Sequence, residues 1–208
     1  MKVKSNNIFF LGLVAVVALI IIYSISGEEL SEQYEREIAT FRQEKNEMFK
    51  TSDQSPLDRN QKKAFDSLDY YPINIAYKVT ADFEKVPIPE VIQIQTSSNQ
   101  KRNFKKLGKA RFYLEGKAHS ILVLKSTDKL AKDVLFVPFG DETSGFDTYG
   151  AGRYLDAELK DDKIILDFNL AYNPYCAYNP EYECPLPPKE NLLDVSIMAG
   201  EKNFKSPN

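Results

Sequence analysis

The residues best suited to chemistry lie in one loop, residues 139–156, which reads FGDETSGFDTYGAGRYLD. Arg153 follows Gly150 and Gly152, and glycine permits positive φ angles and the close approach of another group. A guanidinium can bind a carboxylate or a phosphate through two parallel hydrogen bonds. We therefore expect a small polar or anionic ligand to bind near Arg153. The residues expected to take part are Arg153, Asp141, Thr143, Ser144, Tyr149, Asp167, Asn169 and Glu201.

Other interpretations of these residues stay open. Arg153 could pair with Asp141 or Asp167 and hold the end of a sheet, as a purely structural residue. Alternatively, carboxylates from Asp141, Asp167 and Glu201 could carry out acid–base chemistry in a hydrolase. The loop does not match a calcium loop, which needs Glu at the twelfth position, where Gly152 stands. Whether the protein is an enzyme is not decided by the sequence, and no cofactor is expected.

Two cysteines, Cys176 and Cys184, enclose seven residues in a loop rich in Asn-Pro turns. We predict a disulfide between them, because the domain is predicted below to lie outside the cytoplasm. A zinc site is not expected, since the one histidine, His119, is distant in the sequence. A Cys176–His119 nucleophile pair is a minor alternative. The tyrosines of this loop either stack on a sugar or planar ligand or, as we favour, pack onto the sheet: Tyr172, Tyr175, Tyr178 and Tyr182.

The N-terminal segment Ile8–Ile25 contains 18 residues without a charge. As a helix it would extend ~27 Å, close to the hydrocarbon thickness of a bilayer. Lysines precede it and glutamates follow it, which places the N-terminus in the cytoplasm. The sequence thus predicts a single-pass membrane protein with an extracytoplasmic C-terminal domain. The alternative is a signal peptide, cleaved after Ser26 to leave a secreted or periplasmic domain.

The remaining chain changes its periodicity once. Residues 29–50 predict an amphipathic helix, residues 59–68 a short helix, and from Pro72 onward apolar residues alternate as in strands. We expect a signal anchor at 1–27, a helical lead-in at 28–72 and a β-rich part at 73–208, with 28–208 forming one exported globular unit. The predicted fold is mostly β: an antiparallel sandwich or a partly closed barrel, preceded by N-terminal helices that include one transmembrane helix.

Charge argues against one class of partner. The net charge is −3, so nucleic acid is not an expected partner despite the basic stretch at 101–111. That stretch is interpreted as a solvated face, with anionic lipid as the alternative. The expected partners are the membrane, through the N-terminal helix, and a small ligand. The oligomeric state is not predicted.

Several longer motifs resemble a family of uncharacterised bacterial proteins, a domain of unknown function of the DUF1684 type. They are Ser55-Pro56-Leu57, Phe139-x-Asp141-x-Thr143-Ser144-Gly145, Thr148-Tyr149-Gly150-x-Gly152-Arg153-Tyr154-Leu155, Asp167-Phe168-Asn169-x-Ala171-Tyr172-Asn173-Pro174 and Ala199-Gly200-Glu201. The resemblance runs from about Ile38 to about Phe204 and implies no activity. The leading hypothesis is therefore a membrane-tethered binding domain of the cell envelope. A hydrolase and a structural interaction domain are the alternatives.

Overall fold

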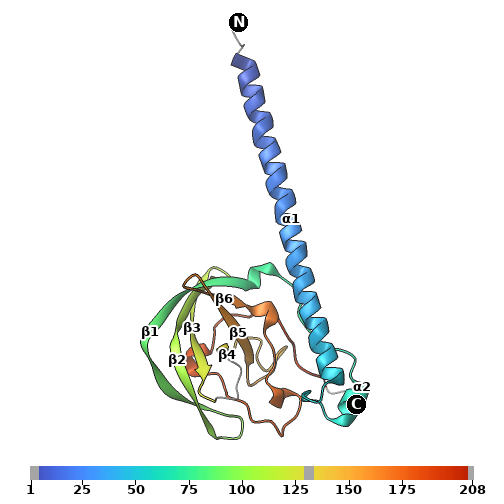
Figure 1. The fold of residues 1–208 in the computed structure, drawn as a ribbon, viewed down its shortest axis with the longest axis vertical. Coiled ribbons are helices and arrows are strands. Elements are labelled where there is room, and N and C mark those ends of the chain that lie inside the picture. The colour runs from blue at the N-terminus through green and yellow to red at the C-terminus, as the bar shows by residue number, and fades with distance from the viewer. Residues whose placement is uncertain (1–4, 129–133, 206–208) are drawn as a thin grey trace. The chain divides into compact units, whose positions relative to one another are not determined.

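The computed structural model describes the backbone of residues 5–128 and 134–205, and it describes side chains at positions 13, 14, 29–128 and 134–205. The chain divides into two compact units, Met1–Phe41 and Arg42–Asn208. The first unit consists of most of helix α1 (Ser5–Thr51) (Figure 1). The second unit contains the end of α1, helix α2 (Arg59–Ala64) and all strands.

The predicted transmembrane helix is corrected. Of the residues that the structure describes, no helix is both long enough and apolar enough to cross a membrane. From residue 29 onward α1 carries acidic and basic residues in nearly every turn. Most side chains of Ile8–Ile25 lie outside the described residues. The finding overturns the predicted transmembrane helix and the single-pass membrane localisation that rested on it.

In the described part of the second unit there are six antiparallel strands: β1 (Lys78–Gln95), β2 (Lys101–Leu114), β3 (Lys117–Ser126), β4 (Leu135–Phe139), β5 (Arg153–Lys160) and β6 (Lys163–Asp167). Each strand pairs with the next, and β6 pairs back with β1, so the barrel is closed (Figure 1). The mostly antiparallel β architecture is therefore as predicted, whereas the sandwich alternative is wrong.

The length of β1 explains why the sheet closes. Prolines are rare inside strands, yet β1 continues through Pro87 and Pro89, with a register shift between Lys85 and Glu90. Such a bulge bends a strand and increases its twist. One half of β1 can therefore pair with β6 while both halves pair with β2. The C-terminal segment, residues 192–205, belongs to none of these strands.

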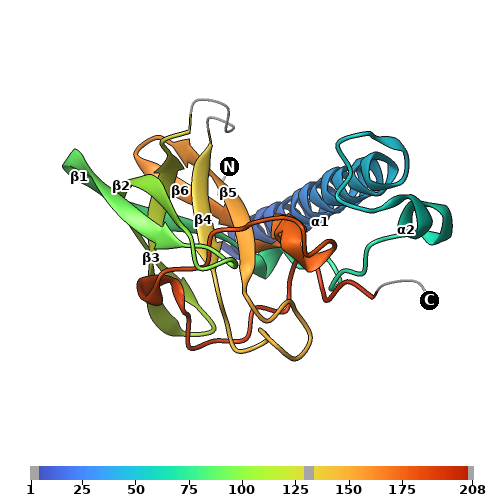
Figure 2. The same ribbon diagram turned by 90° about the horizontal axis from the view of Figure 1, so that it is seen from below.

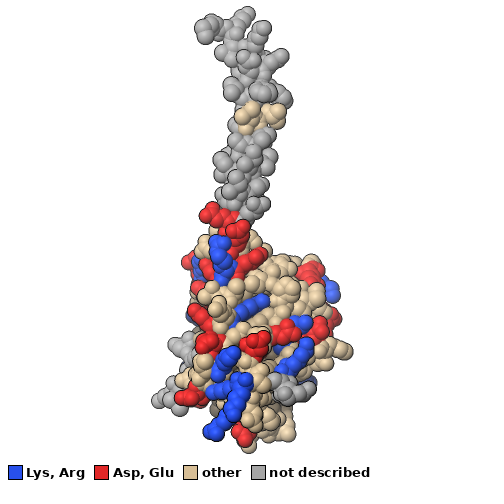
Figure 3. All heavy atoms as spheres, turned by 90° about the vertical axis from the view of Figure 1, so that its right-hand side faces the viewer, with Lys and Arg blue, Asp and Glu red and all other residues tan. Residues whose placement is uncertain are grey.

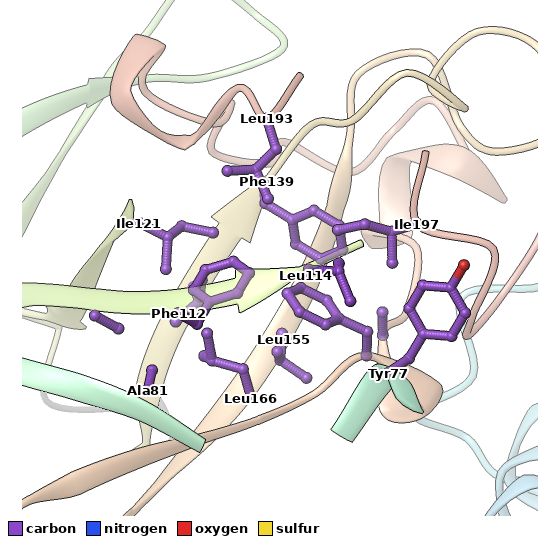
Figure 4. Close-up of a cluster of buried hydrophobic side chains, with 14 of the residues drawn as sticks. Tyr77, Ala81, Phe112, Leu114, Ile121, Phe139, Leu155, Leu166, Leu193 and Ile197 are labelled. Atoms are coloured by element: carbon purple, nitrogen blue, oxygen red, sulfur yellow. The ribbon is translucent and has the colours of Figure 1, made fainter. Parts of the chain in front are cut away.

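Apolar side chains fill the barrel interior (Figure 4). Phe168 contacts Phe112 and Phe139, with ring centroids 5.9 and 5.3 Å apart. Ile197 and Ala199 of the C-terminal segment are also part of this core. A six-stranded barrel of this size holds side chains rather than a ligand. A binding site is therefore to be sought among the loops.

A smaller core joins the helices to the tyrosine-containing loop. Phe49 of α1 packs edge-on against Tyr178 at 4.9 Å, together with Leu57, Phe65 and Leu68. Helix α2 begins at a capping box in which Asp58 and Gln61 satisfy each other's backbone amides. Figure 2 shows α2 beside the C-terminal end of α1. For Tyr178, packing is thus the observed role.

Candidate functional site

Arg153 begins β5 and is fully buried. Its Nη2 donates to Asp141 Oδ2 at 2.7 Å and to the Ile197 carbonyl at 2.9 Å. Its Nη1 donates to the carbonyls of Ala199, at 2.5 Å, and Glu201, at 3.3 Å. The guanidinium therefore ties the 139–156 loop to alternate residues of the C-terminal segment. This geometry supports the structural interpretation of Arg153 over direct contact with a ligand.

Asp141 is equally committed to the protein. Its Oδ1 accepts hydrogen bonds from the Thr143 amide at 2.7 Å and from Thr143 Oγ1 at 2.5 Å, and its side chain is fully buried. Thr143 Oγ1 also lies 2.9 Å from Thr148 Oγ1. The Asp141 amide in turn donates to Ser144 Oγ at 3.1 Å. Arg153, Asp141, Thr143 and Ser144 are thus brought together as predicted, but as a self-contained network.

The Glu201 carboxylate belongs to a second buried network. It accepts from Lys45 Nζ at 2.8 Å, from Asn173 Nδ2 at 3.0 Å and from the Tyr178 hydroxyl. Burial, with the adjacent Glu201 charge, raises the pKa of Tyr178 well above its usual value, so the hydroxyl stays a donor. Sequence reasoning missed Lys45, although a lysine within the apolar stripe of residues 29–50 was a usable signal.

Asp167 and Asn169 form a third group at the end of β6. Asp167 Oδ1 accepts from the Asn169 amide at 3.1 Å, and its other oxygen lies 3.9 Å from Lys78 Nζ. The Asn169 side chain exchanges two hydrogen bonds with the backbone of Asn74, at 2.8 and 2.9 Å. These two predicted site residues hold the segment that leads into β1.

A cleft of about 400 Å³ opens beside the 139–156 loop, and we call it the loop cleft. Its lining is mainly apolar and combines residues of the 140–152 loop with residues of the 186–193 segment. Of the predicted site residues, Asp141 and Ser144 line it. The lining residues are Gly140, Asp141, Ser144, Gly150, Ala151, Gly152, Leu186, Pro187, Leu192 and Leu193.

Gly152 sets the shape of this cleft. Its φ is +88°, and a Cβ placed there would lie 2.5 Å from the Phe139 carbonyl oxygen and 2.7 Å from Pro187 Cγ. Only glycine combines this conformation with so close an approach. The loop therefore packs directly against the 186–193 segment, and the expectation of close approach at the loop glycines is met by the protein's own backbone.

The two cysteines are free thiols, which corrects the predicted disulfide. The prediction rested on an expected extracytoplasmic location and not on any geometric observation. Tyr149, predicted to line a ligand site, instead directs its hydroxyl to Cys176 Sγ at 3.7 Å. The Cys176 amide donates to Cys184 Sγ at 3.2 Å. His119 packs against Phe112 in the barrel, with ring centroids 5.6 Å apart, so it is not a partner of Cys176.

Charges of both signs are intermixed on the face displayed in Figure 3. The basic side chains of 101–111 are mainly exposed along β2, and Arg111 pairs with Glu84 at 2.6 Å. Such mixing is typical of a solvated surface, and a single-sign field that would attract a polyanion is not visible on this face.

Known proteins share sequence and fold with this chain. Residues 63–202 match the model of a family described as "Protein of unknown function (DUF1684)". The solution NMR structure of an uncharacterized protein of Haloarcula marismortui is 35% identical, with a TM-score of 0.65. The match covers 84% of this chain and 96% of that one. No curated protein matches.

Proposed function

We propose that this chain, which belongs to the DUF1684 family of proteins of unknown function, is a domain that binds a small molecule in the loop cleft. The single observation that carries the proposal is the cleft itself. Its volume of about 400 Å³ lies within the range usual for small-molecule sites. It combines an apolar wall with a few fixed polar groups, which is the common composition of such sites.

The polar side of the cleft suits an oxygen-bearing head group. Ser144 Oγ accepts the Asp141 amide, so its own hydrogen remains available to an outside acceptor. Among the described residues, no hydrogen bond engages the amides of Gly150 and Ala151, which lie beside it. The charge of Asp141 is compensated by Arg153, so it does not repel a carboxylate or a phosphate.

The apolar side gives the ligand a second property. Leu186, Pro187 and Leu192 face the same space, and Leu192 is 60% exposed. A ligand that covers them gains the free energy of burying apolar surface. The ligand class that fits both sides is therefore a small molecule with a polar or anionic head and a short apolar body.

The two alternatives receive less support. Asp141, Asp167 and Glu201, the carboxylates of the hydrolase hypothesis, are buried and engaged by different partners. Asp167 and Glu201 do not line the loop cleft, and the carboxylate of Asp141, which does line it, is occupied by Arg153 and Thr143. A structural interaction domain would leave the loop cleft unoccupied by small molecules, which the following experiment distinguishes.

The experiment is a thermal-shift screen of the full chain against short-chain carboxylates, alkyl phosphates and the matching neutral alcohols. A ligand at 100 times its Kd stabilises by about 2.7 kcal/mol, which corresponds to a Tm increase of roughly 5–10 °C for a domain of this size. We expect a carboxylate or phosphate of short chain length to raise the Tm. An absence of any shift across the panel would contradict the proposal.

Two leucines provide the matched variants. Leu192→Glu places a charge in the cleft and should abolish the ligand-induced shift. Leu159→Glu changes a leucine of similar exposure, 50%, on β5 outside the cleft, and should leave the shift intact. Equal ligand responses in the two variants would show that the ligand binds elsewhere.

A further inference from the structure

Cys176 and Cys184 are two thiols in contact but in unequal surroundings. Cys176 is partly exposed, whereas Cys184 is buried. The Cys176 amide donates to Cys184 Sγ at 3.2 Å, and the Tyr149 hydroxyl donates to Cys176 Sγ. We propose that these cysteines form a redox-active dithiol, in which Cys176 attacks the disulfide of a small thiol compound and Cys184 resolves the product.

The buried thiol is held in a fixed position. The Cys184 carbonyl accepts the Ser97 amide at 2.9 Å, and the Cys184 amide donates to Ser97 Oγ at 3.2 Å. Two residues later, the Leu186 amide donates to the Gln95 carbonyl at 2.7 Å. Backbone hydrogen bonds at Cys184 and at Leu186 therefore hold Cys184 beside the end of β1. It presents its sulfur to Cys176 without the chain having to rearrange.

The surroundings also divide the chemical roles. A hydrogen bond from the Cys184 thiol lowers the pKa of Cys176 to about 6, against the effect of burial. The Tyr149 hydroxyl lowers it further. Donating that hydrogen bond raises the pKa of Cys184, so Cys184 remains a thiol. The accessible sulfur is then the nucleophilic thiolate near neutral pH, as attack requires.

The reaction has two steps. The Cys176 thiolate attacks one sulfur of a disulfide R–S–S–R, whose S–S bond breaks, and RS⁻ leaves and takes up a proton. Cys184 then loses its proton and attacks Cys176 Sγ, which forms the Cys176–Cys184 bond and releases the second RSH. In sum, the protein dithiol is oxidised by two electrons and R–S–S–R is reduced to two RSH.

Two simpler interpretations of the cysteine pair lead to different predictions. A buried structural thiol pair is inert to disulfide reagents. A metal pair needs further ligands, and among the described residues no group of three or more His, Cys, Asp or Glu could hold a metal ion. Neither accounts for a partly exposed cysteine whose amide donates to the sulfur of a buried one. Exchange chemistry uses that asymmetry.

The test begins with the full-length reduced protein, equilibrated in buffers of oxidised and reduced glutathione. After acid quench and alkylation, mass spectrometry counts the free thiols. We expect conversion between two free thiols and none, with a midpoint within the glutathione series. Two thiols at every ratio, or a disulfide that persists in the most reducing buffer, would overturn the proposal.

Single variants assign the two roles. Cys184→Ser should accumulate a glutathione adduct on Cys176, because the resolving thiol is missing. Cys176→Ser should acquire an adduct on Cys184 at least 10-fold more slowly. Equal rates for the two variants, or a faster reaction at Cys184, would refute the division of roles.

A third variant tests the positioning residue and does not depend on either cysteine being removed. Tyr149→Phe deletes the hydroxyl that contacts Cys176 Sγ. We expect the pH profile of Cys176 alkylation in this variant to move to higher pH, while its thermal melt stays as in the wild type. An unmoved profile would contradict the assigned role of Tyr149. If a cysteine variant fails to fold, the ratio of Cys176 to Cys184 alkylation in the wild type still measures the asymmetry.

Discussion

Replacing Arg153 with methionine removes one guanidinium and keeps the approximate volume of the side chain. The change leaves the carboxylate of Asp141 buried without its cation, and it removes the donors to three main-chain carbonyls. These losses share one side chain, so they are not added together. Removing one partner of a buried ion pair costs about 3–5 kcal/mol. We expect that loss of unfolding free energy, equivalent to a Tm decrease of roughly 6–20 °C.

Urea denaturation at pH 7 provides the measurement, and an unchanged slope against urea confirms that the native state is intact. The double variant Arg153→Met, Asp141→Asn removes the stranded charge while keeping the oxygen that accepts from Thr143. The double variant should be about 1–2 kcal/mol more stable than Arg153→Met alone, because the side chains at 153 and 141 are neighbours and their effects are coupled. Arg111→Met is the control, since Arg111 is 64% exposed in its pair with Glu84, and it should cost less than about 1 kcal/mol.

An Arg153→Met protein with the same stability as the Arg111→Met protein would contradict this prediction. It would also fail if the double variant were less stable than the single one, because the stranded charge would then not be the source of the cost. If Arg153→Met kept its stability and lost only its response to ligand, Arg153 would belong to the binding machinery instead.

Three further changes follow from particular contacts. Gly152→Ala forces a Cβ against the Phe139 carbonyl and should lower the free energy of unfolding, measured by chemical denaturation, by roughly 2–4 kcal/mol. Gly116→Ala is the control: its φ is +77° and no atom lies within 4 Å of the added Cβ, so the loss should be only about 1–2 kcal/mol. Asn191→Ala removes the side-chain amide that bridges β3 and β4, and it should lower the free energy of unfolding by about 2–4 kcal/mol, since buried backbone groups lose their partners. A loss under 1 kcal/mol would mean that water replaces the side-chain amide. Iodoacetamide should modify Cys176 with a rate that rises through about pH 6. Because this pKa is lower in the folded state than the usual value of 9.0, the contribution of Cys176 to stability should grow as pH rises from about 6 to 9 and should be absent below about pH 6. A midpoint near pH 9 would contradict the hydrogen bond from Cys184.

The sequence predicted the β-rich architecture well because strand periodicity is a local signal. The turns at Glu115-Gly116 and Asp161-Asp162 were also readable, and all four residues have positive φ, as tight hairpins require. Closure of the barrel was less accessible. It depends on the pairing of Lys78–Asp82 with β6, far along the chain, and on a bulge that resembles a strand break in the sequence.

The sequence drew attention to the polar loop, its glycines and Arg153, and the structure brings Arg153 to Asp141 there. What the sequence did not convey was burial. Three of the four acceptors of Arg153 are main-chain carbonyls, which carry no signature in the sequence. The apolar wall of the loop cleft was missed because Leu186 and Leu192 look like ordinary core residues.

The hydrogen bonds from Arg153 to the C-terminal segment also affect the order in which the protein folds during synthesis. All six strands are complete by residue 167, yet the carbonyls that receive Arg153 come at residues 197–201. During synthesis the strands therefore leave the ribosome before their buried arginine has any acceptor other than Asp141. Ile197 and Ala199, which complete the barrel core, arrive equally late. Since domains fold as units, the last step of folding should wait until residues 197–201 have left the ribosome. A ribosome stalled before residue 197 would hold a chain with all six described strands and an incomplete core, open to proteases until residues 197–201 are added.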